Sequence, residues 1–171
     1  MSILHIIKER RSVRKYKPDP IPEEALQRVL DAARFSPSGK NLQPWKFILV
    51  KDESLKQHLV EAAVGQSFIA EAPIVVVACA FPDNCYSRMG NYMKSWSVDV
   101  AIALEHLILQ AQEEELGTCW IGAFEEKEVK SILGVPDGVR VLALTPLGYP
   151  DEKPGSRSRK SLEEIISFNS F

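Results

Sequence analysis

The segment from Val98 to Ala111 restricts the fold of this chain more than any other stretch. Apolar side chains occupy nearly every position of it, so a helix through these residues is hydrophobic on all sides. Its members Asp99, Glu105 and His106 exclude an ordinary membrane-spanning helix. A helix of this kind has to be buried, and a chain of 171 residues offers only a limited core to surround it. The pattern therefore favours a homodimer.

Length and composition indicate one globular domain, residues 1–171. Hydrophobic residues make up 45% and charged residues 26%, and the 21 basic and 23 acidic side chains nearly cancel. No run of like charge is long enough to indicate a nucleic-acid or membrane partner. The N-terminus lacks the pattern of a secretion signal, so we expect a cytoplasmic protein.

The cysteines and histidines show no spacing typical of a metal site. Cys79 and Cys119 lie in apolar stretches, where a reduced thiol in the core is the expected state. His5, His58 and His106 are scattered along predicted helices without paired ligand spacing. We therefore expect structural roles for these residues and no bound metal.

The order of predicted elements indicates an α+β fold, a few strands wrapped by several helices. Helical spacing of apolar residues predicts helices at 3–8, 22–33, 55–63, 98–111 and 125–133, and a capping-box pattern predicts a last short helix from residue 161. Runs rich in β-branched residues predict strands at 46–50, 74–80 and 139–147, and a strand and turn at 118–124. Residues 81–95 show no steady period and are expected to form a loop or a short helix.

A turn-rich stretch, SPSGKNLQPW from Ser36 to Trp45, joins the second predicted helix to the first predicted strand. Its prolines restrict the backbone, and Gly39 permits conformations that other residues avoid. Ser38, Asn41 and Gln43 offer polar groups without formal charge. Taken alone, this composition is typical of an ordinary surface connection.

Two basic clusters lie near the ends of the chain. The first is RRSVR, from Arg10 to Arg14, and the second contains Arg157 and Arg159. Most basic runs are solvated surface. Guanidinium groups beside a hydroxyl are nevertheless the donor set that a phosphate monoester requires, so the first cluster is a candidate phosphate site.

The segments RRSVR, PSGKNLQPW and RSRKSLEE together resemble, in order and spacing, motifs of the nitroreductase family of FMN-dependent oxidoreductases. The similarity covers most of the chain and is weakest at residues 82–95. The loop motif combined with the upstream basic motif is highly specific, whereas either basic cluster alone is a weak signal. The resemblance implies a central, mostly antiparallel sheet surrounded by helices, in a homodimer with two FMN sites at its interface.

The resemblance also implies which residues bind the cofactor. Both basic clusters are expected to hold the phosphate and the pyrimidine edge of the flavin. Arg14 is placed near N1 and the C2 carbonyl, where its charge raises the reduction potential. The loop is expected to contact the flavin of the partner subunit, and backbone N–H groups of the TCWIGAF segment are expected near N5 and O4. The implied set is Arg10, Arg11, Ser12, Arg14, Pro37, Ser38, Gly39, Asn41, Trp120, Ile121, Gly122, Ala123, Arg157 and Arg159.

No side chain of this set is a nucleophile or an obvious proton donor. Gly122 stands where many relatives carry Glu, so no acid–base role is assigned there. The resemblance implies an oxidoreductase that passes hydride from NADH or NADPH through flavin N5 to nitroaromatic or quinone-like acceptors, with ping-pong kinetics. The alternatives are a specialised flavin reaction, such as reductive dehalogenation or flavin fragmentation, and a flavin-binding protein without efficient turnover.

The sequence leaves the physiological acceptor and the choice between NADH and NADPH open. Tyr86, Tyr92 and Trp96, with the methionines between them, form either a substrate-facing lid or ordinary core and interface packing. The same two interpretations apply to Phe124.

Overall fold

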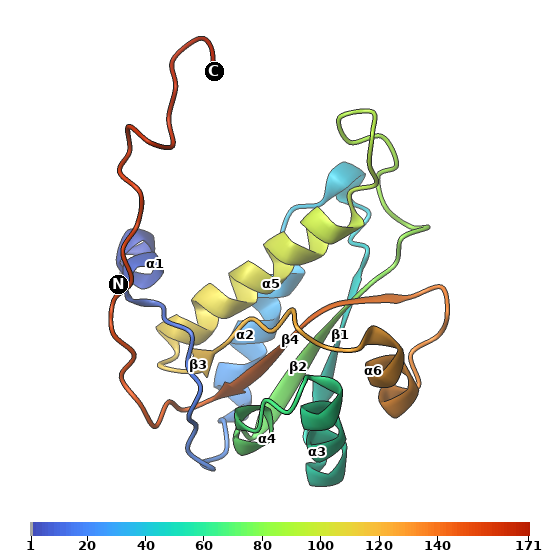
Figure 1. Cartoon of the computed structure of the whole chain (residues 1–171), viewed down its shortest axis with the longest axis vertical. Coiled ribbons are helices and arrows are strands. Elements are labelled where there is room, and N and C mark those ends of the chain that lie inside the picture. The colour runs from blue at the N-terminus through green and yellow to red at the C-terminus, as the bar shows by residue number, and fades with distance from the viewer. Residues whose placement is uncertain (1) are drawn as a thin grey trace.

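The computed structural model describes residues 2–171 and contains a four-stranded antiparallel sheet between two layers of helices (Figure 1). The strands, in the spatial order β1-β2-β4-β3, are β1 (Trp45–Val50), β2 (Ile74–Ala80), β3 (Gly117–Thr118) and β4 (Arg140–Gly148). The helices are α1 (Ile3–Glu9), α2 (Glu23–Arg34), α3 (Glu53–Ala62), α4 (Phe68–Glu71), α5 (Trp96–Glu113) and α6 (Glu126–Leu133), with a 3-10 turn at Gly39–Asn41. The α+β class and the antiparallel sheet are confirmed.

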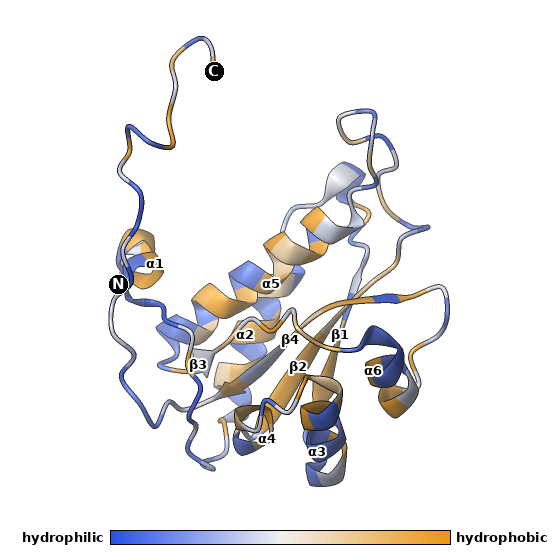
Figure 2. Ribbon diagram, viewed as in Figure 1, coloured by the Kyte–Doolittle hydropathy of each residue, from blue (hydrophilic) through white to orange (hydrophobic). Residues whose placement is uncertain are grey.

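Strand β2 lies at the centre of the molecule, and all seven of its residues are buried. Side chains of a strand alternate between its two faces. Val76 and Ala78 pack toward α2 and α5, whereas Val75 and Val77 pack toward α3, α4 and α6. Helices on both faces explain why this strand is a continuous apolar run (Figure 2).

Helix α5 is buried along one side, where Val100, Leu104 and Leu107 are fully covered by α2 and the sheet. Its other side is only partly covered within one chain. Val98 is 37% exposed, and Ile102 remains half-buried. The expectation of a helix buried all round is therefore met on one side only. None of the helices among residues 2–171 has the length and hydrophobicity needed to cross a membrane.

Two predicted elements differ from the structure. Of the strand and turn expected at 118–124, only Gly117–Thr118 forms a regular strand, because the N–H of Cys119 donates to the hydroxyl of Thr145 and leaves the ladder. Pairing with β4 returns as a single bridge between Ile121 and Leu144. The helix expected from residue 161 is a single turn, although Glu164 accepts the N–H of Ser161 at 2.8 Å as a capping box requires. One turn without tertiary packing does not extend into a helix.

Candidate functional site

The N-terminal segment is tied to the end of the sheet. Val13 donates its N–H to the carbonyl of Thr118, and Lys17 donates to the carbonyl of Tyr149, both at 2.9 Å. The buried Tyr16 hydroxyl donates to the Val13 carbonyl at 2.7 Å. Because the tail leaves the sheet directly after Tyr149, these contacts bring the two basic clusters together.

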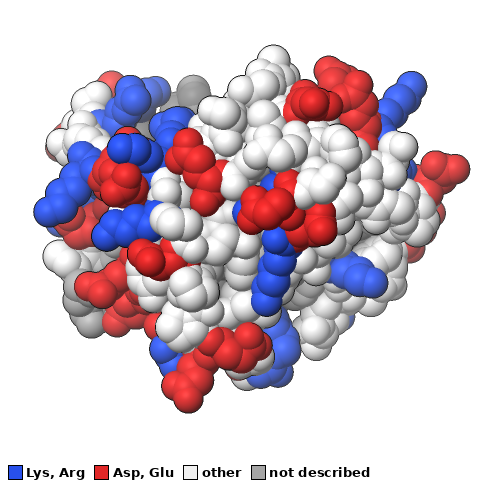
Figure 3. Space-filling view, turned by 90° about the horizontal axis from the view of Figure 1, so that it is seen from below, with Lys and Arg blue, Asp and Glu red and all other residues white. Residues whose placement is uncertain are grey.

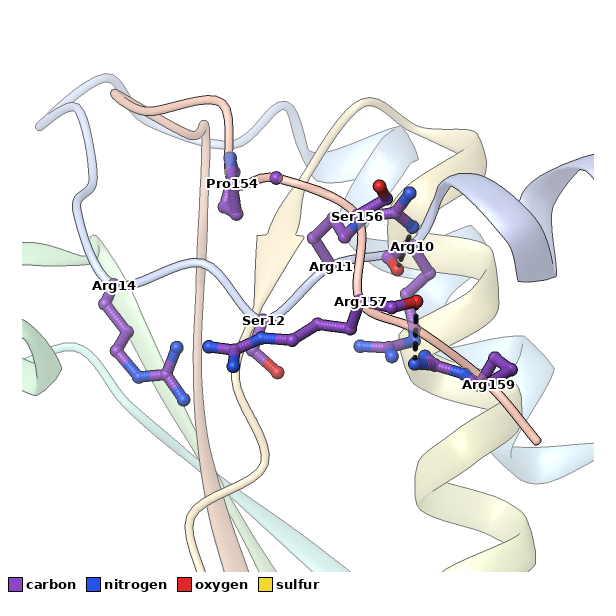
Figure 4. Close-up of a pocket in the computed structure, with 9 residues that line it drawn as sticks. Arg10, Arg11, Ser12, Arg14, Pro154, Ser156, Arg157 and Arg159 are labelled. Carbon is purple, nitrogen blue, oxygen red and sulfur yellow. Dashed lines mark hydrogen bonds between the residues drawn. The ribbon is translucent and has the colours of Figure 1, made fainter.

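A cavity of about 510 Å³ lies between these clusters. Figure 4 shows the side chain of Arg157 extending from the tail toward Ser12. The cavity lining contains five arginines and no carboxylate. Its residues are Arg10, Arg11, Ser12, Arg14, Pro154, Gly155, Ser156, Arg157 and Arg159.

The five arginines differ in how far their charge is engaged. Arg11 donates to the carbonyls of Lys8 and Arg10, so it closes the C-terminal end of α1. Arg159 donates to the carbonyl of Ser158 at 3.0 Å. Within residues 2–171, the guanidinium groups of the remaining three donate no hydrogen bond; these are Arg10, Arg14 and Arg157. Unengaged guanidinium groups around one cavity form a site for an anion.

Two carboxylates, Glu152 and Glu105, lie near the arginines of this site. Glu152 accepts the backbone N–H of Arg14 and so fixes the segment that carries the arginine. Burial raises the pKa of Glu105 on α5, while Arg10 and His106 oppose this shift. Sequence reasoning missed Glu152, since nothing in the local pattern shows that it contacts a residue so far away along the chain.

The loop at residues 38–43 lies away from this cavity, on the first turn of α5. Gly39 donates its N–H to Asp99 Oδ1 at 3.0 Å, and Ser38 Oγ accepts the N–H of Gln43 at 2.9 Å. Lys40, Asn41 and Gln43 have positive φ angles of 53°, 56° and 49°. Such backbone conformations in non-glycine residues are costly and concentrate at functional sites.

Within one chain, the loop and the arginine cavity are separated. The loop contacts Asp99 near the start of α5, whereas the adjoining cavity at Arg11 includes Gln112 near its end. That part of α5 is about 20 Å long at 1.5 Å per residue. Figure 1 shows the same separation, with the loop at the N-terminal end of α5 and the basic segment beside its C-terminal half.

The TCWIGAF segment contributes fewer groups than expected. Ile121 is 3% exposed, and its N–H donates to the Leu144 carbonyl at 2.9 Å, so it offers neither its side chain nor its N–H to a ligand. Gly122 and Ala123 are exposed, and no hydrogen bond in the described part of the chain uses their N–H groups. Trp120 is 40% exposed. Within this segment, the N–H groups that remain available to a ligand are those of Gly122 and Ala123.

The aromatic residues after β2 divide between solvent and core. Tyr92 is 82% exposed, and Tyr86 is half-buried beside the loop, with the Lys40 ammonium 5.4 Å from its ring centroid. Trp96 and Phe124 pack against the two core clusters. Core packing therefore explains the positions of Trp96 and Phe124, and Tyr86 and Tyr92 are the aromatic candidates for a lid.

The three cysteines are free and buried, and residues 2–171 contain no cluster of side chains suited to a metal ion. Burial raises the pKa of the Cys119 thiol, which lies near Ser12 and Arg14. His106 Nδ1 is 2.8 Å from Ser36 Oγ, which agrees with a structural role.

Comparison with known proteins agrees with this geometry. Residues 7–149 match the Nitroreductase family. The NADH dehydrogenase of Thermus thermophilus is 32% identical, with 92% of this chain and 91% of the relative covered. The iodotyrosine deiodinase of Thermotoga neapolitana is 28% identical, with 97% of each chain covered. The solved structure of an FMN-dependent nitroreductase from Clostridium difficile gives a TM-score of 0.85 at 30% identity, with 98% of this chain and 99% of the other covered. The chain therefore belongs to the nitroreductase family.

Proposed function

We propose that this protein is an FMN-dependent NAD(P)H oxidoreductase that reduces nitroaromatic or quinone-like acceptors. The observation that carries the proposal is the cavity lined by five arginines from the two ends of the chain. A phosphate monoester carries a charge of about −1.5 to −2 at neutral pH, and several guanidinium groups match it. The donor set and the cavity size both fit the phosphate end of a nucleotide-like cofactor.

The residues present fit FMN when two copies of the chain are considered together. One chain would hold the phosphate through Arg10, Arg157 and Arg159, with Ser12 as a hydroxyl donor. The partner would supply the loop with Ser38, because within one chain the loop contacts the first turn of α5, whereas the basic segment lies beside the C-terminal half of that helix (Figure 1). A homodimer with two interface sites satisfies both requirements.

Exposed apolar residues support such a dimer. Helix α1 buries no residue, and its Ile3 and Leu4 are 73% and 58% exposed. Phe35 is 73% exposed and lines a largely apolar cavity of about 370 Å³ between α1, α2 and α5. An apolar surface of this kind is typical of a protein interface. By contrast, the face in Figure 3 carries interspersed charges of both signs.

Bound FMN supplies the hydride chemistry. The chain binds and orients the cofactor and adjusts its electrostatics. Arg14 would place positive charge beside the pyrimidine edge and so raise the reduction potential. The N–H groups of the exposed residues Gly122 and Ala123 would be available to carbonyl or ring-nitrogen acceptors. No side chain of the chain is assigned a proton-transfer step. Because donor and acceptor would use the same cavity in turn, the kinetics are expected to be ping-pong.

Reductive dehalogenation is a second candidate, since a relative that covers this chain almost completely is named iodotyrosine deiodinase. The family resemblance associates that reaction with a longer lid. The segment at residues 81–95 is short, which favours planar acceptors instead.

Spectroscopy on the purified protein tests the proposal. We expect a flavin spectrum, or uptake of added FMN by the colourless protein, followed by bleaching with NADH or NADPH under anaerobic conditions. A nitroaromatic or a quinone should then restore the oxidised spectrum, and an iodinated tyrosine should do so much more slowly. Failure to bind FMN contradicts the whole proposal, whereas bound FMN that neither nicotinamide reduces indicates a flavin-binding protein without turnover.

A further inference from the structure

A buried carboxylate joins two segments that the assigned function does not link. Asp99, in the first turn of α5, is 4% exposed. Its Oδ1 accepts the N–H of Gly39 at 3.0 Å, and its Oδ2 accepts the hydroxyl of Ser95 at 2.6 Å. The Ser95 Oγ in turn accepts the N–H of Tyr86 at 3.1 Å. Asp99 is thus connected to the loop at 38–43 on one side and to the segment at 86–95 on the other.

The two segments also meet without spare room. A Cβ atom at Gly39 would lie 2.6 Å from the Cβ of Tyr86 and 3.2 Å from Ser95 Oγ. The contact at Gly39 therefore depends on the absence of a side chain. Any shift of the loop would have to displace Tyr86 or open a gap beside it.

The loop needs such support because its backbone is strained. Lys40, Asn41 and Gln43 all have positive φ, and non-glycine residues keep this conformation only where surrounding contacts hold it. Asp99, Ser38 and Gln43 each make a side-chain hydrogen bond to the loop backbone, and Asp99 is the member of this set that lies outside the loop. The carboxylate itself is stabilised by its position in the first turn of a long helix and by its two donors, the N–H of Gly39 and the hydroxyl of Ser95.

We propose that Asp99 is a positioning residue that locks the loop at 38–43 and the segment at 86–95 into one unit. It contacts neither the arginine cavity nor its lining residues. Its consequence for turnover rests on the proposed function: Asp99 keeps the loop, which would contact the cofactor, in a fixed position relative to Tyr86 and its segment. Recognition of the electron acceptor then depends on a residue that does not touch it.

Hydrogen exchange on the FMN-free protein tests the lock directly. In Asp99→Asn, exchange should rise about 10- to 100-fold in both segments, since the single amide oxygen can accept from only one of the two donors and both segments lose their charged partner. Ser95→Ala should raise exchange mainly at 86–95, because the bond from Gly39 to Asp99 remains. Asp31→Asn, an exposed carboxyl on α2 that pairs with Arg34, serves as the control and should change neither segment.

Kinetics with saturating FMN provide the second readout. We expect Asp99→Asn to raise KM for the acceptor about tenfold with kcat within about twofold, because the residue acts on placement and not on the reaction. Gly39→Ala should shift KM in the same direction, whereas Gly138→Ala, which has open space around it, should not.

The outcomes separate this inference from the proposed function. Unchanged exchange in Asp99→Asn, a change in one segment only, or a uniform rise over the whole chain overturns the lock. A loss of kcat in Asp99→Asn as large as the rise in KM would overturn it as well. So would an equal change in KM in Gly39→Ala and Gly138→Ala. A wild-type protein that binds no FMN contradicts the proposed function, and the exchange experiment still decides the lock.

Discussion

Arg10, Arg14 and Arg157 hold positive charge in a cavity whose lining contains no carboxylate. They come from two segments that are far apart in sequence, and hydrogen bonds along the end of the sheet bring them together. Arg11 differs from them, since it donates to backbone carbonyls at the end of α1. Substitution of Arg11 would therefore affect α1 as well as the cavity, and the unengaged arginines are the sharper probes.

Arg14→Gln should weaken FMN binding about tenfold, because it removes one charge-assisted contact without leaving a buried charge unpaired. The reduction potential of bound FMN should also become more negative. Titration of the flavin-free protein and spectroscopic redox titration measure the two effects. Arg28→Gln is the matched control, since Arg28 pairs with Glu114 outside the cavity. Equal behaviour of the two variants would contradict the assignment of Arg14.

The buried thiol of Cys79 predicts a loss of stability at alkaline pH. Burial raises its pKa to about 11. As the pH rises above about 9, the unfolded thiol loses its proton first, so the free energy of unfolding falls until the folded thiol also ionises. The slope from one such group is at most about 1.4 kcal/mol per pH unit. Denaturant titrations between pH 8 and 11, at about half-unit steps, should show a shallower fall in Cys79→Ala than in the wild type.

At the scale of elements, local sequence patterns predict most helices and strands, and contacts between elements hold them in their places. Helix α3 illustrates this, because its Lys56 is buried and 1% exposed. The ammonium group donates to the carbonyl of Ala72 at 2.7 Å and to that of Ala70 at 3.3 Å, and it pairs with Glu53 at 2.9 Å. It thereby closes the C-terminal end of α4 and fixes the start of β2.

Lys56→Met should destabilise the protein by about 2 kcal/mol, because two backbone carbonyls lose their donor in a buried place. Glu53→Gln removes only the ion-pair partner, whose side chain is 77% exposed, and should cost well under about 1 kcal/mol. Urea denaturation followed by circular dichroism measures both values. Similar costs for the two variants would show that the ion pair, and not the carbonyl contacts, makes the difference.

At the scale of the whole molecule, a single chain exposes apolar surface that a stable monomer would normally cover. This surface combines α1, Phe35 and the half-buried side of α5. Figure 2 shows apolar residues on α1, although that helix buries none of them. Helix α5 is also the helix whose sequence is hydrophobic on all sides.

Phe35→Glu should shift the protein toward the monomer and weaken FMN retention together, since the proposed site needs both subunits. Analytical ultracentrifugation over a range of concentrations and flavin titration measure the two properties. Val64→Glu is a matched control, because Val64 is 72% exposed and lies at the end of α3, away from this surface. A monomeric variant that keeps FMN as well as the wild type would contradict the interface site.

The sequence by itself determined the fold class, most element positions and the family, because hydrophobic period and motif spacing are local properties. Strand β2 and the end of α6 at Gly134, which adopts a left-handed conformation, follow the predictions closely. The sequence also revealed the two basic clusters, but only the fold brings them together around one cavity.

Only the tertiary structure decided which groups remain available for a ligand. The N–H of Ile121 donates to the carbonyl of Leu144 and is not available to a ligand. The last predicted helix remains a single turn because it has no surface to pack on. Asp99 in the sequence is one acidic residue within an apolar helix, and only the packing of three separate segments makes it a buried acceptor. Hydrogen-bond partners that are distant in sequence leave no local pattern, and for this reason these residues could not be assigned before the chain was folded.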